Sequence, residues 1–320
     1  MRKLSFKSES WPIAGTFTIA RGSKTVADVI VVTVVENGFT GRGEAVPYPR
    51  YNETVEQTLA ALAAATPAIE AGLTPELPRA AANALDCALW DLSSKQTNIP
   101  VWSLAKLSTP KAVITAFTIS LDTPEVMARA AKAAAKRPLL KLKLGREGDH
   151  ERLRAIREAA PNCRLIVDAN EGWNAASLAE MLAACEKYGV ELVEQPLPAT
   201  ADEALRDMLH RVLICADESA HDRKSLHELE GKYDAINIKL DKTGGLTEAL
   251  LLAADAKAQE FKIMVGCMLA TSLAMAPAFL LAQLADYVDL DGPLLLSKDR
   301  DPGFAFDGSV MLPPPRALWG

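Results

Sequence analysis

The chain has 320 residues, of which 49% are hydrophobic and 24% are charged, and its formal net charge at pH 7 is -6. This length accommodates one large barrel and a smaller domain, and the composition is that of an ordinary soluble globular protein. The acidic balance argues against nucleic acid as the main partner, although a local Arg or Lys could still bind an anionic substrate.

Cysteine usage and the lack of a leader-like segment predict a cytoplasmic protein. The N-terminal ten residues contain no apolar run of the kind found in signal peptides. The uncharged stretch 263–285 is long enough to span a bilayer, but Gly266 and Pro277 interrupt it, so we expect a strand and a helix there and no membrane partner. The cysteine spacing fits neither a zinc site nor a disulfide framework, which indicates a reducing compartment. The five cysteines are Cys87, Cys163, Cys185, Cys215 and Cys267.

Residues 1–110 predict an α+β domain. A β-branched run at 29–35 precedes Gly38, Gly41 and Gly43, a pattern typical of strands joined by tight turns. Helical periodicity follows at 55–69 and 79–94. Because the strands precede the helices, we expect a separate α+β domain that caps the rest of the chain.

From Val113 onward, strands and helices alternate. Strand ends recur about every 25 residues, the size of one βα unit of a barrel. The predicted strands lie at 113–119, 139–144, 165–168, 192–194, 214–217, 236–239, 263–266 and 288–291. The predicted helices lie at 123–135, 149–160, 175–188, 202–209, 223–229, 245–259 and 271–284.

This alternation is also compatible with an open doubly wound sheet. That fold calls for a glycine-rich phosphate loop after an early strand, and residues 143–146 (KLGR) are a poor one. We therefore predict an α/β fold with a (β/α)8-type barrel, a modified TIM barrel, over 111–298. The C-terminal segment 299–320 should pack back on the capping domain.

Charged residues recur near the carboxyl ends of the predicted strands, which indicates a polar site. Burying one charge costs several kcal/mol unless the charge is paired or bound to a metal. Side chains alternate along a strand, so Lys141 and Lys143 should point into the barrel, and Lys143 should face Lys239 across its mouth. The acids on the third, fourth and fifth strands are Asp168, Glu194 and Asp217.

Three carboxylates on consecutive strands suit a hard divalent ion, Mg²⁺ in the first instance with Mn²⁺ as a substitute. The alternative is ion pairing between these acids and the lysines. Two lysines flanking a metal indicate proton transfer at a carbon next to a carboxylate, where the metal stabilises the resulting enediolate. A lysine acts as a base only when neutral, and positive charge from Lys141 and the metal would lower its pKa. One base on each face predicts racemisation or epimerisation.

These positions resemble the enolase superfamily, in particular its muconate-lactonizing-type subgroup with a Lys-x-Lys pair, a lone Lys and Mg²⁺. The resemblance extends to the dipeptide epimerases and covers nearly the whole chain. It implies 1,1-proton transfer at the C-terminal Cα of L-Ala-D-Glu and L-Ala-L-Glu, with Lys143 and Lys239 as the two bases and Lys141 as a source of positive charge. The segments that carry the resemblance are 19–23, 83–92, 168–171, 194–198, 216–219 and 237–245.

The resemblance also implies substrate contacts. Asp289 and Asp291 of Asp289-Leu290-Asp291-Gly292 would bind the α-ammonium of the dipeptide. Without the resemblance, the two acids would read as a solvated strand end. Arg21, in a loop over the barrel, would bind the side-chain carboxylate of the C-terminal glutamate, a role that suits a planar bidentate donor.

Two further residues would support the site. Asn170 should lie one layer above Asp168 and orient a metal ligand or a water. Glu218 should face away from Asp217 if the strand stays regular, and would support the fifth-strand site from there.

The implied context is the recycling of cell-wall peptides in a bacterial cytoplasm, and a homo-oligomer is compatible with the sequence. Another reaction of the subgroup stays open, such as o-succinylbenzoate synthesis or N-acylamino acid racemisation. A non-catalytic barrel that binds peptides is the alternative from a different class. Asp289 and Asp291 would distinguish dipeptide epimerisation from the other reactions of the subgroup. Exchange of a Cα proton with solvent would exclude the non-catalytic barrel.

Overall fold

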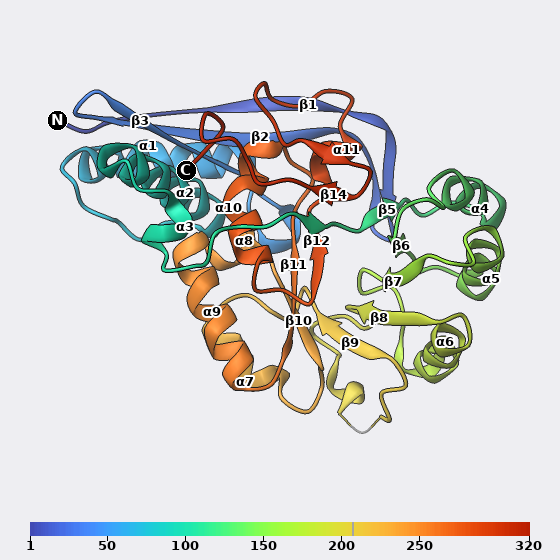
Figure 1. The fold of residues 1–320 in the computed structure, drawn as a ribbon. Helices are drawn as coiled ribbons and strands as arrows, with labels where there is room; N and C mark the ends of the chain where they lie inside the picture. Colours follow the sequence, from blue (N-terminus) through green and yellow to red (C-terminus); the bar gives the residue numbers. More distant parts are fainter. Residues whose placement is uncertain (207) are drawn as a thin grey trace.

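The computed structural model describes residues 1–206 and 208–320. Its N-terminal part is an antiparallel sheet covered by helices (Figure 1). The strands are ordered β1-β2-β3. Strands β1 and β2 are long and reach past the helices of this N-terminal part to the barrel, near β5 and β6 (Figure 1). The elements are β1 (Lys3–Ile19), β2 (Gly22–Glu36), β3 (Phe39–Ala45), the 3-10 turn η1 (Pro49–Tyr51), α1 (Val55–Glu70), α2 (Arg79–Thr97) and α3 (Val101–Leu104).

Two of the glycines that predicted turns lie inside a strand instead. Gly38 has φ +81° and forms the β2–β3 turn, but Gly41 and Gly43 belong to β3. A Cβ on Gly43 would lie 2.1 Å from the carbonyl oxygen of Ala84 in α2. These glycines are therefore required because strand and helix backbones touch, and the tight-turn interpretation is wrong for them.

The second part is a barrel of eight strands, all joined in parallel along the order β5 to β12. A hydrogen bond from Ala116 N to Val288 O, 2.8 Å long, links the two ends of the sheet. The predicted barrel is thereby confirmed. Its strands are β5 (Phe117–Ile119), β6 (Leu139–Lys143), β7 (Arg164–Asp168), β8 (Val190–Glu194), β9 (Leu213–Ala216), β10 (Ala235–Ile238), β11 (Lys262–Gly266) and β12 (Tyr287–Asp289).

The predicted first strand is two strands in the structure. Only β5 belongs to the barrel, whereas β4 (Val113–Ile114) pairs with β14 (Val310–Met311), which also pairs with β13 (Phe306–Asp307). This pairing joins segments almost two hundred residues apart, so local periodicity carries no sign of it.

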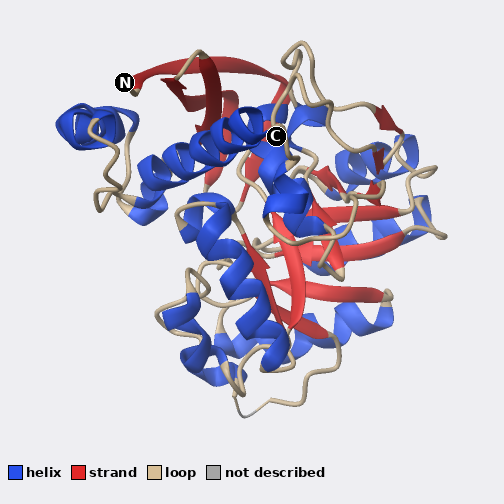
Figure 2. Ribbon diagram, turned by 60° about the vertical axis from the view of Figure 1, so that its left-hand side comes forward, coloured by secondary structure: helices blue, strands red, loops and turns tan. Residues whose placement is uncertain are grey.

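Helices surround the barrel strands (Figure 2). The predicted helix at 202–209 is wrong in length: only the 3-10 turn η2 (Glu203–Leu205) forms, and residue 207 lies outside the described residues. The single turn α8 after β10 was not predicted. The remaining elements are α4 (Pro124–Ala133), α5 (Asp149–Ala159), α6 (Ala175–Lys187), η3 (Arg223–Ser225), α7 (Leu226–Leu229), α8 (Leu240–Thr243), α9 (Leu246–Ala258), α10 (Ser272–Ala282) and α11 (Gly292–Leu295).

An inner core fills the barrel and sets the height of the site. It contains one buried residue from each of the eight strands, counting Ala116, which directly precedes β5. Side chains two apart share a face and stand about 6.6 Å apart along the strand, so the next inward residue on each strand lies above this core. The inner residues are Ala116, Leu139, Ile166, Leu192, Cys215, Ala235, Met264 and Tyr287.

The end of the chain contacts β3 and α2. The Arg42 guanidinium donates to the carbonyls of Ala317 and Leu318, and Trp319 donates its ring N–H to Cys87 O. In the described ranges, no helix is long and apolar enough to cross a membrane. Stretch 263–285 holds all of β11 except its first residue, Lys262, and the whole of α10, so it is a strand and a helix as predicted.

Candidate active site

The functional side chains stand directly above the inner core. Lys141 follows Leu139 by two residues on β6, Asp168 follows Ile166 on β7, and the same spacing places Glu194, Asp217 and Asp289. One period-2 pattern thus provides the apolar filling of the barrel and the polar site at its carboxyl end.

Lys141 lies at the bottom of this polar layer, and its side chain is 1% exposed. Its Nζ lies 2.6 Å from Glu194 Oε2, 2.6 Å from Asp289 Oδ2 and 3.2 Å from Asp168 Oδ2. Burial alone would lower the pKa of Lys141, but these acids raise it well above its usual value. Lys141 is therefore a permanent buried cation.

Lys143 and Lys239 line the same cavity of about 650 Å³. They come from β6 and from the end of β10, which three strands separate in the ring. Lys143 Nζ lies 2.6 Å from Asp168 Oδ2, and Lys239 Nζ lies 2.7 Å from Asp217 Oδ2. Two lysines thus reach one space from different sides, each beside a carboxylate.

The predicted lowering of the base pKa depends on Lys141 together with a bound metal ion, and for the metal-bound protein it stays a prediction. Burial and the charge of Lys141 lower the Lys239 pKa, but Asp217 and Glu194 raise it well above its usual value. Nearby acids outweigh nearby cations here, since the Asp217 carboxylate is in direct contact with Nζ.

Asp168, Glu194 and Asp217 form a buried set of oxygen donors. Asp168 and Glu194 are neighbours in strand register. Burial raises the pKa of Glu194, and the charges of Asp168 and Asp217 raise it further. Oxygen donors of this kind are the ligands that Mg²⁺ prefers. Among the described residues, Glu194 Oε2 is buried and accepts no hydrogen bond, and its one close partner is the Lys141 ammonium at 2.6 Å. The residues therefore fit a hard divalent ion.

In this structure, however, the three carboxylates form ion pairs with lysines. Within the part of the chain that the structure describes, no group of three or more His, Cys, Asp or Glu side chains is arranged to hold a metal ion. Burial would raise the pKa of Asp168, but Lys143 and Lys141 lower it below its usual range. The ion-pairing alternative thus describes this arrangement, and binding of a cation would require the lysines to give up these contacts.

Lys242 contributes to the site and was missed from the sequence. It is fully buried in α8, and its Nζ donates to Asp217 Oδ1 at 2.6 Å, to Asp217 O at 2.6 Å and to Asn237 O at 2.9 Å. Asn237 in turn donates to Glu194 Oε1 at 2.7 Å. Lys242 therefore fixes Asp217, and the available signal was its position one helical turn after Lys239.

Asp289 and Asp291 are buried, which contradicts a solvated strand end. Asp289 Oδ2 pairs with Lys141, while its Oδ1 has no partner among the described residues. Asp291 Oδ2 accepts a hydrogen bond from Thr118 N at 2.7 Å. Burial, with the adjacent charge of Asp289, raises the pKa of Asp291 to about 7. Neither acid lines the 650 Å³ cavity, so their contact with an ammonium group stays a prediction.

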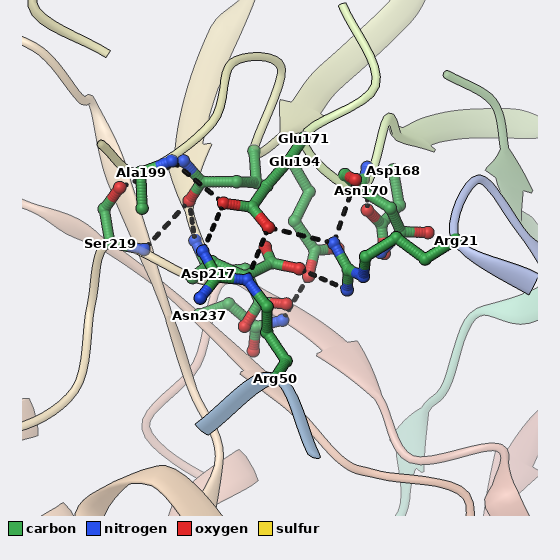
Figure 3. A network of polar contacts seen from close by, with 12 residues as sticks. Arg21, Arg50, Asp168, Asn170, Glu171, Glu194, Ala199, Asp217, Ser219 and Asn237 are labelled. Carbon is green, nitrogen blue, oxygen red and sulfur yellow. Dashed lines mark hydrogen bonds and ion pairs between the residues drawn. The ribbon is translucent and has the colours of Figure 1, made fainter. Parts of the chain in front are cut away.

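Arg21 joins the β1–β2 turn to the barrel rim (Figure 3). One terminal nitrogen donates to Asn170 O at 2.9 Å and to Glu171 Oε2 at 3.1 Å, and the other donates to Glu218 Oε1 at 2.6 Å. Arg50 of η1 also binds Glu171, through two hydrogen bonds of 2.7 and 2.8 Å. Arg21 lies at the cavity as predicted, but it is already paired with acids of the protein.

The predicted orientation of Glu218 is wrong. Strand β9 ends at Ala216, so the alternation does not continue, and both Asp217 and Glu218 line the cavity. Burial raises the pKa of Glu218 to about 7, with contributions from the charges of Asp217 and Asp168.

Asn170 lies next to Asp168 in an unusual backbone conformation. Asn170, Glu171 and Gln195 have φ of +47°, +64° and +37°, and such residues carry about 1–3 kcal/mol of strain each. Asn170 N donates to Asp168 Oδ1 at 2.9 Å. The loop after β7 thus orients Asp168 through a backbone amide, while Asn170 Oδ1 is buried without a partner among the described residues.

Two family models match the chain. Residues 1–105 match the mandelate racemase / muconate lactonizing enzyme N-terminal domain, and residues 125–316 match the enolase C-terminal domain-like family. The chain therefore belongs to the mandelate racemase / muconate lactonizing enzyme family of the enolase superfamily.

Two relatives are similar to this protein over nearly the full chain. L-Ala-D/L-Glu epimerase of Escherichia coli (strain K12) is 47% identical, over 96% of this chain and 98% of that protein. N-acetyl-D-glutamate racemase of a Pseudoalteromonas species is 45% identical, over 91% of this chain and 95% of that protein.

Solved structures agree with this assignment. An enolase family member from Agrobacterium tumefaciens with homology to dipeptide epimerases, bound to sodium and L-Ala-L-Glu, has a TM-score of 0.98 and 49% identity, with 100% of both chains covered. A dipeptide epimerase from Enterococcus faecalis V583, complexed with Mg and L-Leu-L-Tyr, has a TM-score of 0.90 and 30% identity, with 99% of this chain and 98% of that chain covered.

Proposed function

We propose that this protein is a Mg²⁺-dependent dipeptide epimerase that interconverts L-Ala-D-Glu and L-Ala-L-Glu by 1,1-proton transfer at the C-terminal Cα. The observation that carries the proposal is that Lys143 and Lys239, from separated strands, line one cavity. The relative from Escherichia coli named L-Ala-D/L-Glu epimerase supports the reaction and the substrate.

Each lysine serves one face of the substrate. Lys143 takes or returns the proton on one face and Lys239 on the other, so a proton lost from one face can be replaced on the opposite one. Lys141, held between three acids, supplies fixed positive charge as negative charge develops on the substrate carboxylate. Lys242 keeps Asp217 in place while Lys239 moves its proton.

Asp168, Glu194 and Asp217 would hold the metal ion. When bound, Mg²⁺, or Mn²⁺ in its place, supplies positive charge that stabilises the substrate carboxylate as the α-proton becomes acidic. The complex of the Enterococcus faecalis dipeptide epimerase with Mg supports this choice of ion.

The remaining roles follow the resemblance. Asp289 and Asp291 bind the α-ammonium, Arg21 lies near the side-chain carboxylate, and Asn170 and Glu218 support the metal ligands and Arg21. Residues 1–110 cap the barrel of residues 111–298, and residues 299–320 return to the cap. The free cysteines support a cytoplasmic location, where recycling of cell-wall peptides would supply the dipeptide.

N-acylamino acid racemisation is the second candidate. Asp289 and Asp291 already have partners within the fold, Lys141 and Thr118 N, and an N-acyl substrate brings no ammonium to them. The relative named N-acetyl-D-glutamate racemase favours the same alternative.

Proton NMR in D₂O tests both functions. The protein with Mg²⁺ and L-Ala-L-Glu should lose the glutamate Cα signal while the L,D diastereomer grows. N-acetyl-L-glutamate in a parallel sample should exchange at least tenfold more slowly. Faster exchange of N-acetyl-L-glutamate would select the second candidate, and no exchange of either compound would reject both.

A further inference from the structure

The basic side chains around the cavity differ in whether they already have acidic partners. Lys143 pairs with Asp168 and Lys239 pairs with Asp217. Arg21 pairs with Glu171 and Glu218. Lys24 also lines the cavity, and within residues 1–206 and 208–320 its ammonium makes no ion pair with an acid. A ligand carboxylate would therefore meet Lys24 as a cation that needs to break no ion pair.

The hairpin of β1 and β2 places Lys24 close to Lys143. Lys24 and Phe17 are directly opposed partners in this antiparallel pair, so their side chains project from the same face. Lys143 Nζ lies 5.7 Å from the centre of the Phe17 ring. Phe17, the register partner of Lys24, thus lies against one of the two proposed bases, and all three residues line the cavity.

Tyr48 limits where the Lys24 ammonium can go. Lys24 Nζ lies 5.1 Å from the centre of the Tyr48 ring, and both residues line the cavity. This cation–π contact holds the ammonium against the wall and leaves its N–H donors available. A carboxylate on a short side chain could be bound here while its Cα lies between the two lysines.

Arg21 has contacts that suit a different task. Its two terminal nitrogens are engaged with Asn170 O, Glu171 and the buried Glu218. On the other side of the same turn, Arg146 donates to the carbonyls of Ile19 and Ala20. Arg21 and Arg146 together fasten the hairpin tip to the barrel, and a ligand carboxylate at Arg21 would have to compete with Glu218.

We propose that Lys24 is the residue that selects an acidic side chain on the C-terminal residue of the dipeptide, and that Arg21 is a positioning residue that holds the hairpin on the barrel. This inference rests on the proposed function, because it names the group that recognises the substrate of that reaction. It moves the selection of charge from Arg21, which the resemblance indicated, to its neighbour on β2.

The test compares two dipeptides that differ in charge but hardly in shape, L-Ala-L-Glu and L-Ala-L-Gln. The variants are Lys24→Met, Lys24→Arg, Arg21→Met and, as a matched control, Lys3→Met at an exposed position of β1. For each variant, kcat and KM are measured with Mg²⁺ by the formation of the second epimer. The readout is the ratio of kcat/KM for the two dipeptides.

We expect Lys24→Met to lower this ratio at least tenfold, about 1.4 kcal/mol, mainly through KM for L-Ala-L-Glu, and Lys24→Arg to restore it. Arg21→Met should lower kcat/KM for both dipeptides together and keep the ratio, and Lys3→Met should keep both values. A ratio that stays constant in Lys24→Met, or that falls only in Arg21→Met, would overturn the inference.

Calorimetric binding of both dipeptides to the Mg²⁺-loaded protein makes the inference testable without turnover. If the wild type epimerises neither dipeptide, the proposed function fails. Preferential binding of L-Ala-L-Glu that disappears in Lys24→Met would still support the role of Lys24. Equal binding of the two dipeptides by the wild type would reject it.

Discussion

At the scale of single residues, the ion pairs between lysines and acids define the site. Lys141 pairs with three acids and is a fixed cation. Lys143 pairs with Asp168, Lys239 pairs with Asp217 at 2.7 Å and with Glu194 at 3.8 Å, and both of these lysines line the cavity. The Lys242 ammonium donates three hydrogen bonds, two to Asp217 and one to Asn237. The same side-chain type therefore carries three different tasks, separated by burial and by the number of acidic partners.

Asp291 provides a test at this scale. Asp291→Asn keeps an oxygen that can accept from Thr118 N but removes a charge next to Asp289, so the fold should persist while an ammonium is bound less well. We expect KM for L-Ala-L-Glu to rise about tenfold or more, since a charge-assisted hydrogen bond contributes about 1.5–3 kcal/mol.

Asp286→Asn is the matched control, because Asp286 also accepts from a backbone N–H, that of Ile263, but is partly exposed. Its steady-state constants should match the wild type. An unchanged KM in Asp291→Asn would count against dipeptides as the substrates.

At the scale of elements, α8 connects the second base to the capping domain. It begins directly after Lys239, and its Asp241 accepts hydrogen bonds from Val46 N at 2.9 Å and from Asn83 Nδ2 at 2.8 Å. Burial raises the pKa of Asp241 to about 7. The position of the Lys239 segment thus depends on a buried carboxyl group that spans the two parts of the molecule.

This carboxyl group predicts a pH dependence of stability. The folded-state pKa lies above the unfolded value of about 3.9, so the folded protein binds more protons between these values and loses stability as pH rises through them. Asp241→Asn removes this loss. Its free energy of unfolding, relative to the wild type, should increase by on the order of 1 kcal/mol per pH unit from pH 5 to pH 7 and then level off.

Urea unfolding at pH 5, 6, 7 and 8 measures this difference. Asp255→Asn, at an exposed site on α9, should show a difference that is nearly constant with pH. A constant difference for Asp241→Asn as well would show that this carboxyl group does not titrate as described.

The contact between β3 and α2 gives a second test at this scale. A Cβ at position 43 would overlap the Ala84 carbonyl, and backbone on both sides leaves little room to adjust. Gly43→Ala should therefore lower the free energy of unfolding by about 2–3 kcal/mol, measured by urea titration. Thr40→Ala, exposed on the same strand, should cost less than about 0.5 kcal/mol, and equal effects of the two would argue against the close approach.

At the scale of the whole molecule, the barrel could be predicted because its evidence is local. Five strands show an inward residue of the core followed two residues later by a charged residue of the site, as in Ile166 and Asp168. The lysines and acids were found for the same reason, since an apolar strand that ends in a charge is visible in a window of six residues.

Other features depend on contacts between distant segments, and no local sequence pattern predicts them. The pairing of β4 with β14, the approach of Gly43 to α2 and the contacts of Arg21 with Glu171 and Glu218 each join segments separated by at least forty residues. Glu218 was misplaced because β9 ends at Ala216, so the alternation of side chains that the prediction extended to Glu218 stops before it. Closure of the ring, by contrast, is what brings Lys143 and Lys239 to one cavity.

The most direct test of this two-base geometry is solvent exchange in single lysine variants, followed by proton NMR in D₂O with Mg²⁺. Lys239→Ala should exchange the Cα proton of only one of L-Ala-L-Glu and L-Ala-D-Glu and form no opposite epimer, and Lys143→Ala should exchange only the other. If Lys239→Ala still interconverts both epimers at the wild-type rate, Lys239 is not one of the two bases and the two-base mechanism is contradicted.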